Sequence, residues 1–83
     1  MKKEIEKIIL ETINECLIEK GFDAYDALPL EQIILDSDLD SMDLAIIVSE
    51  LEAKLGYDPF TLIDEPIYPE TFNQFLDIYI KYS

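Results

Sequence analysis

The chain has 83 residues, of which 19 are acidic and 6 are basic, so its formal net charge at pH 7 is −13. A chain of this length forms one domain with a modest core, and its negative field repels nucleic acid and anionic membranes, so we expect no nucleic-acid binding and no membrane insertion. The absence of histidine and the single cysteine exclude a serine triad and a zinc site.

The first predicted element is a helix over residues 2–20. Apolar residues recur at helical spacing along one face of this segment: Ile5, Ile8, Ile9, Ile13, Cys16 and Leu17. Gly21 is a suitable end for the helix. Cys16 lies on the apolar face, so we interpret it as a buried hydrophobic residue. The segment carries charges throughout, unlike a signal peptide, and together with the lone cysteine this favours a reducing, cytoplasmic location.

A long connection follows, over residues 22–39, and contains Pro29. Its apolar residues are expected to fix it to the core: Leu28, Leu30, Ile33, Ile34 and Leu35. A loop of this length in a small domain is usually functional or anchored.

A second helix is predicted from Ser41 to about Leu55, ended by Gly56. Its buried face consists of Leu44, Ile47, Val48, Leu51 and Leu55. A short helix is expected next, with Asp58 as its N-cap and Pro59 at its first position.

The last helix follows Pro66 and Pro69, with Thr71 as N-cap and Gln74 three residues on, which is a capping-box pattern. Its apolar face consists of Phe72, Phe75, Leu76, Tyr79 and Ile80. No segment alternates in the manner of a strand. The predicted fold class is therefore all-α: a small bundle of three main helices, with one short helix between the second and the last and a long loop after the first.

The stretch ILDSDLDSMDLAII, residues 34–47, gathers aspartates at the start of the second helix: Asp36, Asp38, Asp40 and Asp43. An EF-hand loop beginning at Asp36 would need glycine at its sixth position and glutamate at its twelfth, where this chain has Ser41 and Ile47. We therefore reject a dedicated calcium site. A structural interpretation explains Asp40 as an N-cap and Asp43 as an acid in the first turn, but it leaves the other two aspartates unexplained.

Ser41 offers a further interpretation. A serine in the first turn of a helix stands where backbone N–H groups and the helix dipole favour an attached anion. Because no base lies nearby in the sequence, Ser41 cannot activate itself as a nucleophile, but it can accept a group that another enzyme installs.

The segment DLDSMDLAIIVSELEAKLGYDPF resembles the acyl and peptidyl carrier proteins, whose hallmark is Asp-Ser and an apolar residue at the start of the second helix. Asp40-Ser41-Met42 occupies that place. The resemblance extends over nearly the whole chain: an apolar first helix, a long loop, an acidic second helix, a short third helix and a Pro-Glu-Thr-Phe entry into the last. It implies an acyl-carrier-type bundle.

The resemblance implies that residues 1–83 form a single carrier domain that is not an enzyme. Ser41 would bear 4'-phosphopantetheine, transferred from coenzyme A by a phosphopantetheinyl transferase. Acyl or aminoacyl groups would be attached to the arm as thioesters. A ligase would load them, and the carrier would deliver them to a downstream synthase or transferase. We expect the carrier to be a monomer.

Partner docking is also implied by the resemblance, with Asp40 helping to dock the transferase or its magnesium ion. The implied docking residues are Asp40, Met42, Asp43, Ile46, Glu50 and Glu52. Two positions depart from the family pattern: Asp38 replaces a common glycine, and Ile46 replaces an acid typical of fatty-acid carriers. Both favour a carrier of a specialised pathway. The alternative is an unmodified acidic helical adaptor that binds a basic protein partner.

Overall fold

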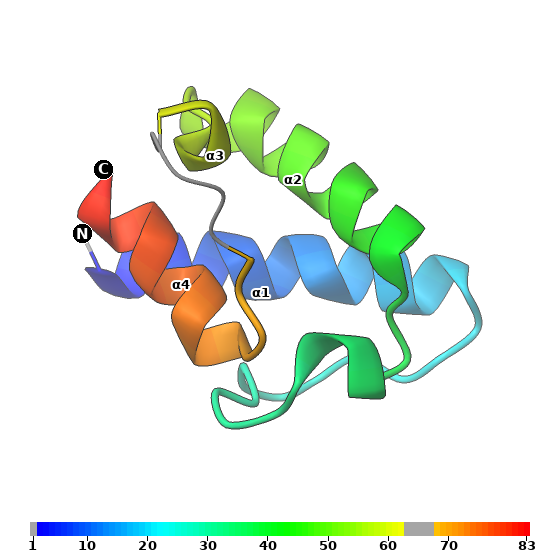
Figure 1. Ribbon diagram of the computed structural model, residues 1–83. Coiled ribbons are helices and arrows are strands. Elements are labelled where there is room, and N and C mark those ends of the chain that lie inside the picture. The colour runs from blue at the N-terminus through cyan, green and yellow to red at the C-terminus, as the bar shows by residue number, and fades with distance from the viewer. Residues whose placement is uncertain (1, 63–67) are drawn as a thin grey trace.

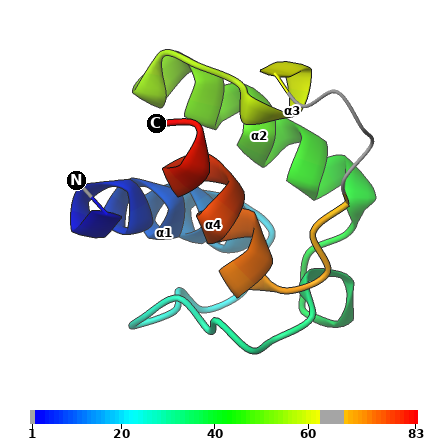
Figure 2. The ribbon, with the colours of Figure 1, turned by 60° about the vertical axis from the view of Figure 1, so that its left-hand side comes forward.

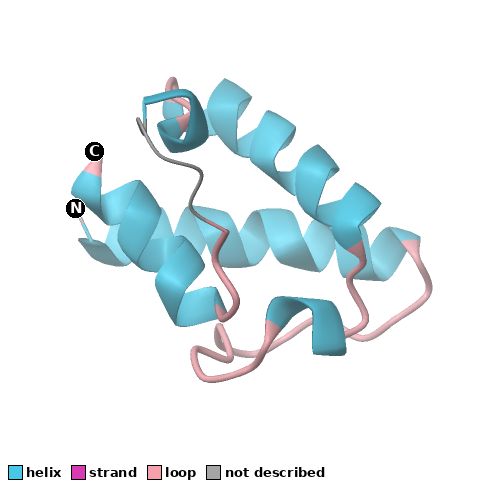
Figure 3. Ribbon diagram, viewed as in Figure 1, coloured by secondary structure: helices cyan, strands magenta, loops and turns pink. Residues whose placement is uncertain are grey.

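The computed structural model describes residues 2–62 and 68–83, and this part of the chain is helical (Figure 1, Figure 3). Its elements are α1 (Lys2–Glu19), the 3-10 helix η1 (Ile34–Asp36), α2 (Ser41–Leu55), α3 (Pro59–Leu62) and α4 (Phe72–Lys81). The predicted all-α bundle of three main helices and one short helix is confirmed. Pro66, expected to break the chain before the last helix, lies outside the described residues.

Helix α1 is the centre of the bundle, because both α2 and α4 pack against it. Figure 1 shows α2 crossing α1 obliquely, with the start of α2 near the end of α1. In both Figure 1 and Figure 2, α4 lies in front of α1 and below α2. The connection between α1 and α2 runs along the bundle beneath these helices and carries η1. The start of α2 therefore lies near the end of α1, although the long connection separates the two in the sequence.

The core is formed by the apolar faces that the periodicity predicts. Its buried hydrophobic residues on the main helices are Ile5, Ile9, Ile13, Cys16, Leu17, Ile47, Leu51, Phe72, Phe75, Leu76 and Tyr79. Other predicted members are partly buried at its edge: Ile8, Leu44, Val48, Leu55 and Ile80. Full burial of such a side chain contributes about 1.5–3 kcal/mol, so these faces dominate the free energy of folding.

The two glycines end their helices in the left-handed conformation. Gly21 has φ 88°. Its N–H donates to the Ile18 carbonyl at 3.0 Å, and the Phe22 N–H donates to the Leu17 carbonyl at 2.8 Å, which is the Schellman pattern. Gly56 has φ 86° and closes α2. A side chain would be strained at either position, so the predicted helix ends are confirmed.

Side-chain caps start the last two helices as predicted. The Phe60 N–H donates to Asp58 Oδ1 at 2.9 Å, ahead of Pro59 at the first position of α3. The Gln74 N–H donates to Thr71 Oγ1 at 3.2 Å, and the Gln74 side chain accepts from the Thr71 N–H, which completes a capping box. These bonds satisfy N–H groups that a helix start leaves without partners.

The connection between α1 and α2 reaches the core at fewer points than predicted. Leu28 and Ile34 are buried. The prediction was wrong for Leu30, Ile33 and Leu35, which are 36%, 44% and 60% exposed.

The physical reason is that the backbone, as well as side chains, anchors this connection. The Ile34 N–H donates to the Glu70 carbonyl at 2.8 Å, and the Asn73 N–H donates to the Leu30 carbonyl at 2.9 Å. Ile33 forms an isolated antiparallel bridge with Thr71. Extended backbone sends successive side chains to opposite sides, so Ile33 faces out while Ile34 faces in. Leu39, 2% exposed, supplies an anchor that the sequence analysis missed.

Tyr79 places a polar atom in the core. The residue is 0% exposed, and its hydroxyl has no hydrogen-bond partner within the described residues. Burial raises the pKa of this phenol, and the charge of Asp58 adds to the effect. A buried polar group without a partner costs about 1–3 kcal/mol.

We expect Tyr79→Phe to raise the free energy of unfolding by about 1 kcal/mol, because it removes a hydroxyl that gains no hydrogen bond. Urea denaturation measures the change. The matched control is Tyr57→Phe, which removes a hydroxyl that donates to the Tyr79 carbonyl at 2.7 Å and should lower stability. Destabilisation by Tyr79→Phe would show that the hydroxyl has a partner in solution.

Candidate functional site

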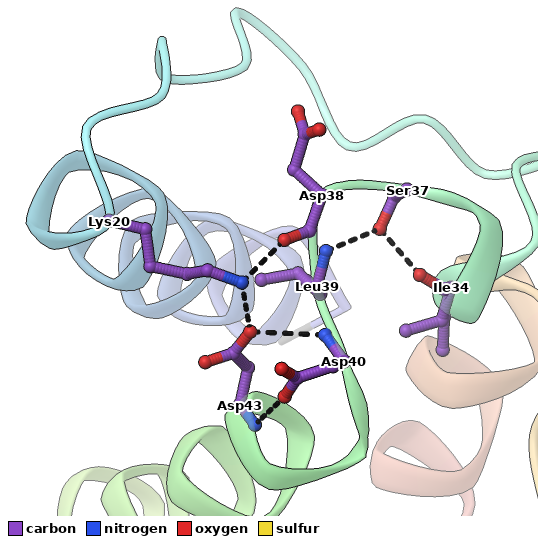
Figure 4. A network of polar contacts seen from close by, with 7 residues as sticks. All are labelled: Lys20, Ile34, Ser37, Asp38, Leu39, Asp40 and Asp43. Atoms are coloured by element: carbon purple, nitrogen blue, oxygen red, sulfur yellow. Dashed lines mark hydrogen bonds and ion pairs between the residues drawn. The ribbon is translucent and has the colours of Figure 1, made fainter.

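The start of α2 is built around a reciprocal pair of caps (Figure 4). The Asp43 N–H donates to Asp40 Oδ1 at 2.9 Å, and the Asp40 N–H donates to Asp43 Oδ2 at 3.0 Å. The prediction that Asp40 caps the helix is confirmed. Asp43 does more than complement the helix dipole, because it completes the capping box.

Lys20, at the end of α1, holds this helix start in place. Its ammonium forms an ion pair with Asp43 and donates to the Asp38 carbonyl at 2.6 Å (Figure 4). The Asp38 backbone thus has a structural role that the sequence analysis did not find. Lys20 and Asp43 are 23 residues apart, and no local pattern connects them. We call Lys20, Asp38 and Asp43 the α1–α2 clamp.

The contact between Lys20 and Asp43 shifts the pKa values of both side chains. The pKa of the Asp43 carboxyl lies below its ordinary value of 3.8, because Lys20 and then the Asp40 backbone N–H donate hydrogen bonds to the charged form. The pKa of the Lys20 ammonium lies above 10.5, because its hydrogen bond to Asp43 favours the protonated form. Asp43's contribution to stability is present above 3.8 and is lost as the pH falls through its folded pKa. Lys20's contribution is present below 10.5 and is lost as the pH rises through its folded pKa.

We therefore expect Lys20→Met to lower the thermal midpoint by a few degrees near neutral pH, and to have less effect below the folded pKa of Asp43 or above that of Lys20. The matched control is Lys7→Met, which removes the same charge from an exposed position of α1. Melting curves across the pH range measure the difference between the two variants. Equal midpoints for the two variants at neutral pH would contradict a structural role for the clamp.

Two serines lie in the acidic stretch, and the structure distinguishes them. The Ser37 hydroxyl donates to the Ile34 carbonyl and accepts from the Leu39 N–H at 3.2 Å, so it is used within the connection (Figure 4). Ser41 is exposed as the first residue of α2, and its hydroxyl has no hydrogen bond to any described residue. Because Asp40 supplies the cap, Ser41 has no capping task. The Ser41 hydroxyl is therefore not used by the described part of the fold.

An apolar groove of about 360 Å³ lies beside Ser41. Its described lining residues are Ser41, Leu44, Ala45, Val48, Phe60 and Pro69. Helix α2 forms one wall, and Phe60 of α3 and Pro69, from the segment before α4, contribute to the rest of the lining. Ser41 is the one lining residue in this set with a polar side chain. The arrangement places an exposed serine beside an apolar concave space.

Of the six predicted docking residues, five are exposed or half-buried on or beside α2, and the sixth, Asp43, is paired with Lys20. Met42 and Ile46 are 75% and 51% exposed and, with the half-buried Glu50, recur every four residues along one face of α2. Asp40 and Glu52 are also exposed. The side chain of Asp43 is 14% exposed and is turned toward Lys20 (Figure 4). The docking role of all six residues stays a prediction.

The clustered aspartates do not converge on a point. Among residues 2–62 and 68–83, no group of three or more His, Cys, Asp or Glu side chains is arranged to hold a metal ion. Burial, with the nearby Asp43 charge as a second cause, raises the pKa of the Cys16 thiol, so this thiol is held in its unreactive protonated form. Among the described residues, the start of α2 therefore offers neither a metal site nor a reactive thiol.

No helix in the described part of the chain is long and apolar enough to span a membrane. Comparison with protein-family models, with curated proteins and with solved structures finds no match to this chain.

Proposed function

We propose that this protein is an acyl carrier protein, which holds acyl or aminoacyl groups as thioesters on a 4'-phosphopantetheine arm attached to Ser41. The observation that carries the proposal is the exposed Ser41 at the start of α2, beside an apolar groove and free of any capping task. The arm supplies a terminal thiol for the thioester. The chain itself holds and delivers the cargo and performs no catalysis.

The local electrostatics support attachment of an anion at Ser41. Backbone N–H groups in the first turn of α2 and the helix dipole favour the negative charge of a phosphodiester. Asp40 and Asp43 oppose it, but the Lys20 ammonium offsets the Asp43 charge. The clamp therefore makes the acidic stretch more tolerant of a phosphate than its sequence suggests.

Attachment requires a second protein, because no described side chain forms a hydrogen bond to the Ser41 hydroxyl that could remove its proton. A phosphopantetheinyl transferase would remove it. The Ser41 oxygen then forms a bond to the phosphorus of coenzyme A that bears pantetheine, and adenosine 3',5'-bisphosphate leaves. This chain's part is to present the oxygen and, through the groove, to shelter the apolar part of what is attached.

Partner recognition would use the outer face of α2. Met42 and Ile46 offer apolar contacts, and Asp40 at the start of α2 and Glu52 near its end add exposed negative charge. A transferase, a loading ligase and a downstream synthase or transferase with basic docking surfaces would associate quickly under the net charge of −13. Ile46 in place of an acid favours a specialised pathway over general fatty-acid synthesis.

An unmodified acidic adaptor is the alternative, favoured by the same charge and by the exposure of Met42 and Ile46. Coexpression with a broad-specificity transferase distinguishes the two functions. A carrier gains the mass of one arm, whereas an adaptor keeps its mass and binds a basic protein.

A further inference from the structure

The two lysines that flank the acidic stretch are both used in contacts between α1 and α2. Between Lys20 and Lys54 the chain has acidic residues but no basic one. The Lys54 ammonium donates to Thr12 Oγ1 and to Glu15 Oε1, each at 3.0 Å. The Lys20 ammonium is held in the clamp. The negative charge of the stretch between them attracts a basic partner.

Asp43 differs from Asp40, its neighbour at the start of α2, because it is already paired with a basic side chain. Both hydrogen bonds that its carboxylate accepts, from Lys20 and from the Asp40 N–H, end at Oδ2, and the described residues leave Oδ1 unused (Figure 4). The Asp43 side chain is 14% exposed, whereas Asp40 is exposed. A partner that approaches Ser41 therefore meets Asp40 directly but must compete with Lys20 for Asp43.

We propose that Lys20 is a specificity-determining residue: by competing for Asp43, it favours a partner that presents an arginine to the start of α2 over one that presents a lysine. A guanidinium can bind both oxygens of a carboxylate at once and so can use Oδ1, whereas an ammonium is a point charge. A partner's lysine would only repeat the contact of Lys20, which has the advantage of belonging to the same chain. The inference rests on the docking proposed above and not on attachment at Ser41, because a carrier and an adaptor both bind a basic partner.

Two short peptides with blocked ends, hexa-arginine and hexalysine, test the inference on the unmodified protein. Calorimetry in one low-salt buffer gives the Kd of each, and the amide NMR shifts of Met42 and Asp43 report binding at the start of α2. The readout is the Kd of hexalysine divided by the Kd of hexa-arginine. We expect Lys20→Met to lower this ratio about two- to fivefold, because hexalysine gains access to Asp43. Lys7→Met removes the same charge from an exposed position of α1 and should leave the ratio at its wild-type value.

Asp43→Asn provides the second part of the test. Without the carboxylate Lys20 has nothing to withhold, so Asp43→Asn should itself lower the ratio, and the further change Lys20→Met should then leave it unaltered. The asparagine keeps an oxygen that can accept from the Asp40 N–H, so the helix start is preserved. Far-UV circular dichroism confirms that each variant is folded.

Four outcomes overturn the inference: no amide shifts at Met42 and Asp43, a ratio that Lys20→Met leaves unchanged, an equal fall in Lys7→Met, or an effect of Lys20→Met that persists beside Asp43→Asn. The two proposals fail separately. A protein that gains the arm but whose ratio does not respond to Lys20→Met refutes the role of Lys20. A protein whose ratio responds but that never gains the arm refutes the carrier function.

Discussion

Replacing Ser41 by alanine is expected to abolish attachment of the arm and to leave the fold intact. The substitution removes the proposed acceptor oxygen. It should change stability by only about 0.5 kcal/mol, because Ser41 is exposed and the cap of α2 is Asp40. Intact mass after incubation with transferase and coenzyme A reports attachment, and far-UV circular dichroism reports helix content.

Two other serines provide controls for this experiment. Ser49→Ala alters an exposed serine on the same helix and should gain the arm like the wild-type protein. Ser37→Ala removes the hydroxyl that bonds Ile34 and Leu39, so it should lower stability and still gain the arm. Attachment to the Ser41→Ala variant would mean that another residue is the acceptor.

Replacing Ile46 by glutamate should weaken partner docking without unfolding the protein, whereas the same change at Ile47 should strongly destabilise it. Ile46 is 51% exposed and Ile47 is 0% exposed. A carboxylate at the exposed position changes stability by about 0.5 kcal/mol. At the buried position it is an unpaired charge in the core and costs ~3 kcal/mol or more, against a total stability of about 5–15 kcal/mol.

The readouts are the thermal midpoint and the kcat/KM of arm transfer by the transferase. For Ile46→Glu we expect a near wild-type midpoint and a several-fold lower kcat/KM, because a charge replaces an apolar contact. A stable Ile46→Glu variant with an unchanged kcat/KM for both the transferase and the cognate loading ligase would remove Ile46 from the docking surface. A strongly destabilised variant would show that the residue is packed against the core.

The helices could be predicted because their signals are local. The apolar period, the cap at Asp40 and the glycine after Leu55 define α2, and its observed bounds, Ser41–Leu55, agree with the prediction. The capping box of Thr71 and Gln74 defines the start of α4 in the same way. Each of these features depends on residues within one turn of each other.

The connection and the clamp could not be predicted because they depend on distant contacts. Burial in an irregular segment follows its backbone partners, so the exposure of Ile33 depends on Thr71 far along the chain. The pair of Lys20 and Asp43 likewise depends on how α1 and α2 cross. The groove beside Ser41 needs α3 to be placed against α2. Sequence patterns do not specify such geometry.

The central claim is that Ser41 carries a phosphopantetheine arm, and peptide mapping of the wild-type protein tests it most directly. The purified protein is incubated with coenzyme A and a broad-specificity transferase, with an established carrier protein as a positive control in the same reaction, and is then digested and sequenced by mass spectrometry. The account predicts one arm per chain, on Ser41. An unmodified chain beside a fully modified control, or an arm on Ser37 or Ser49, would contradict it.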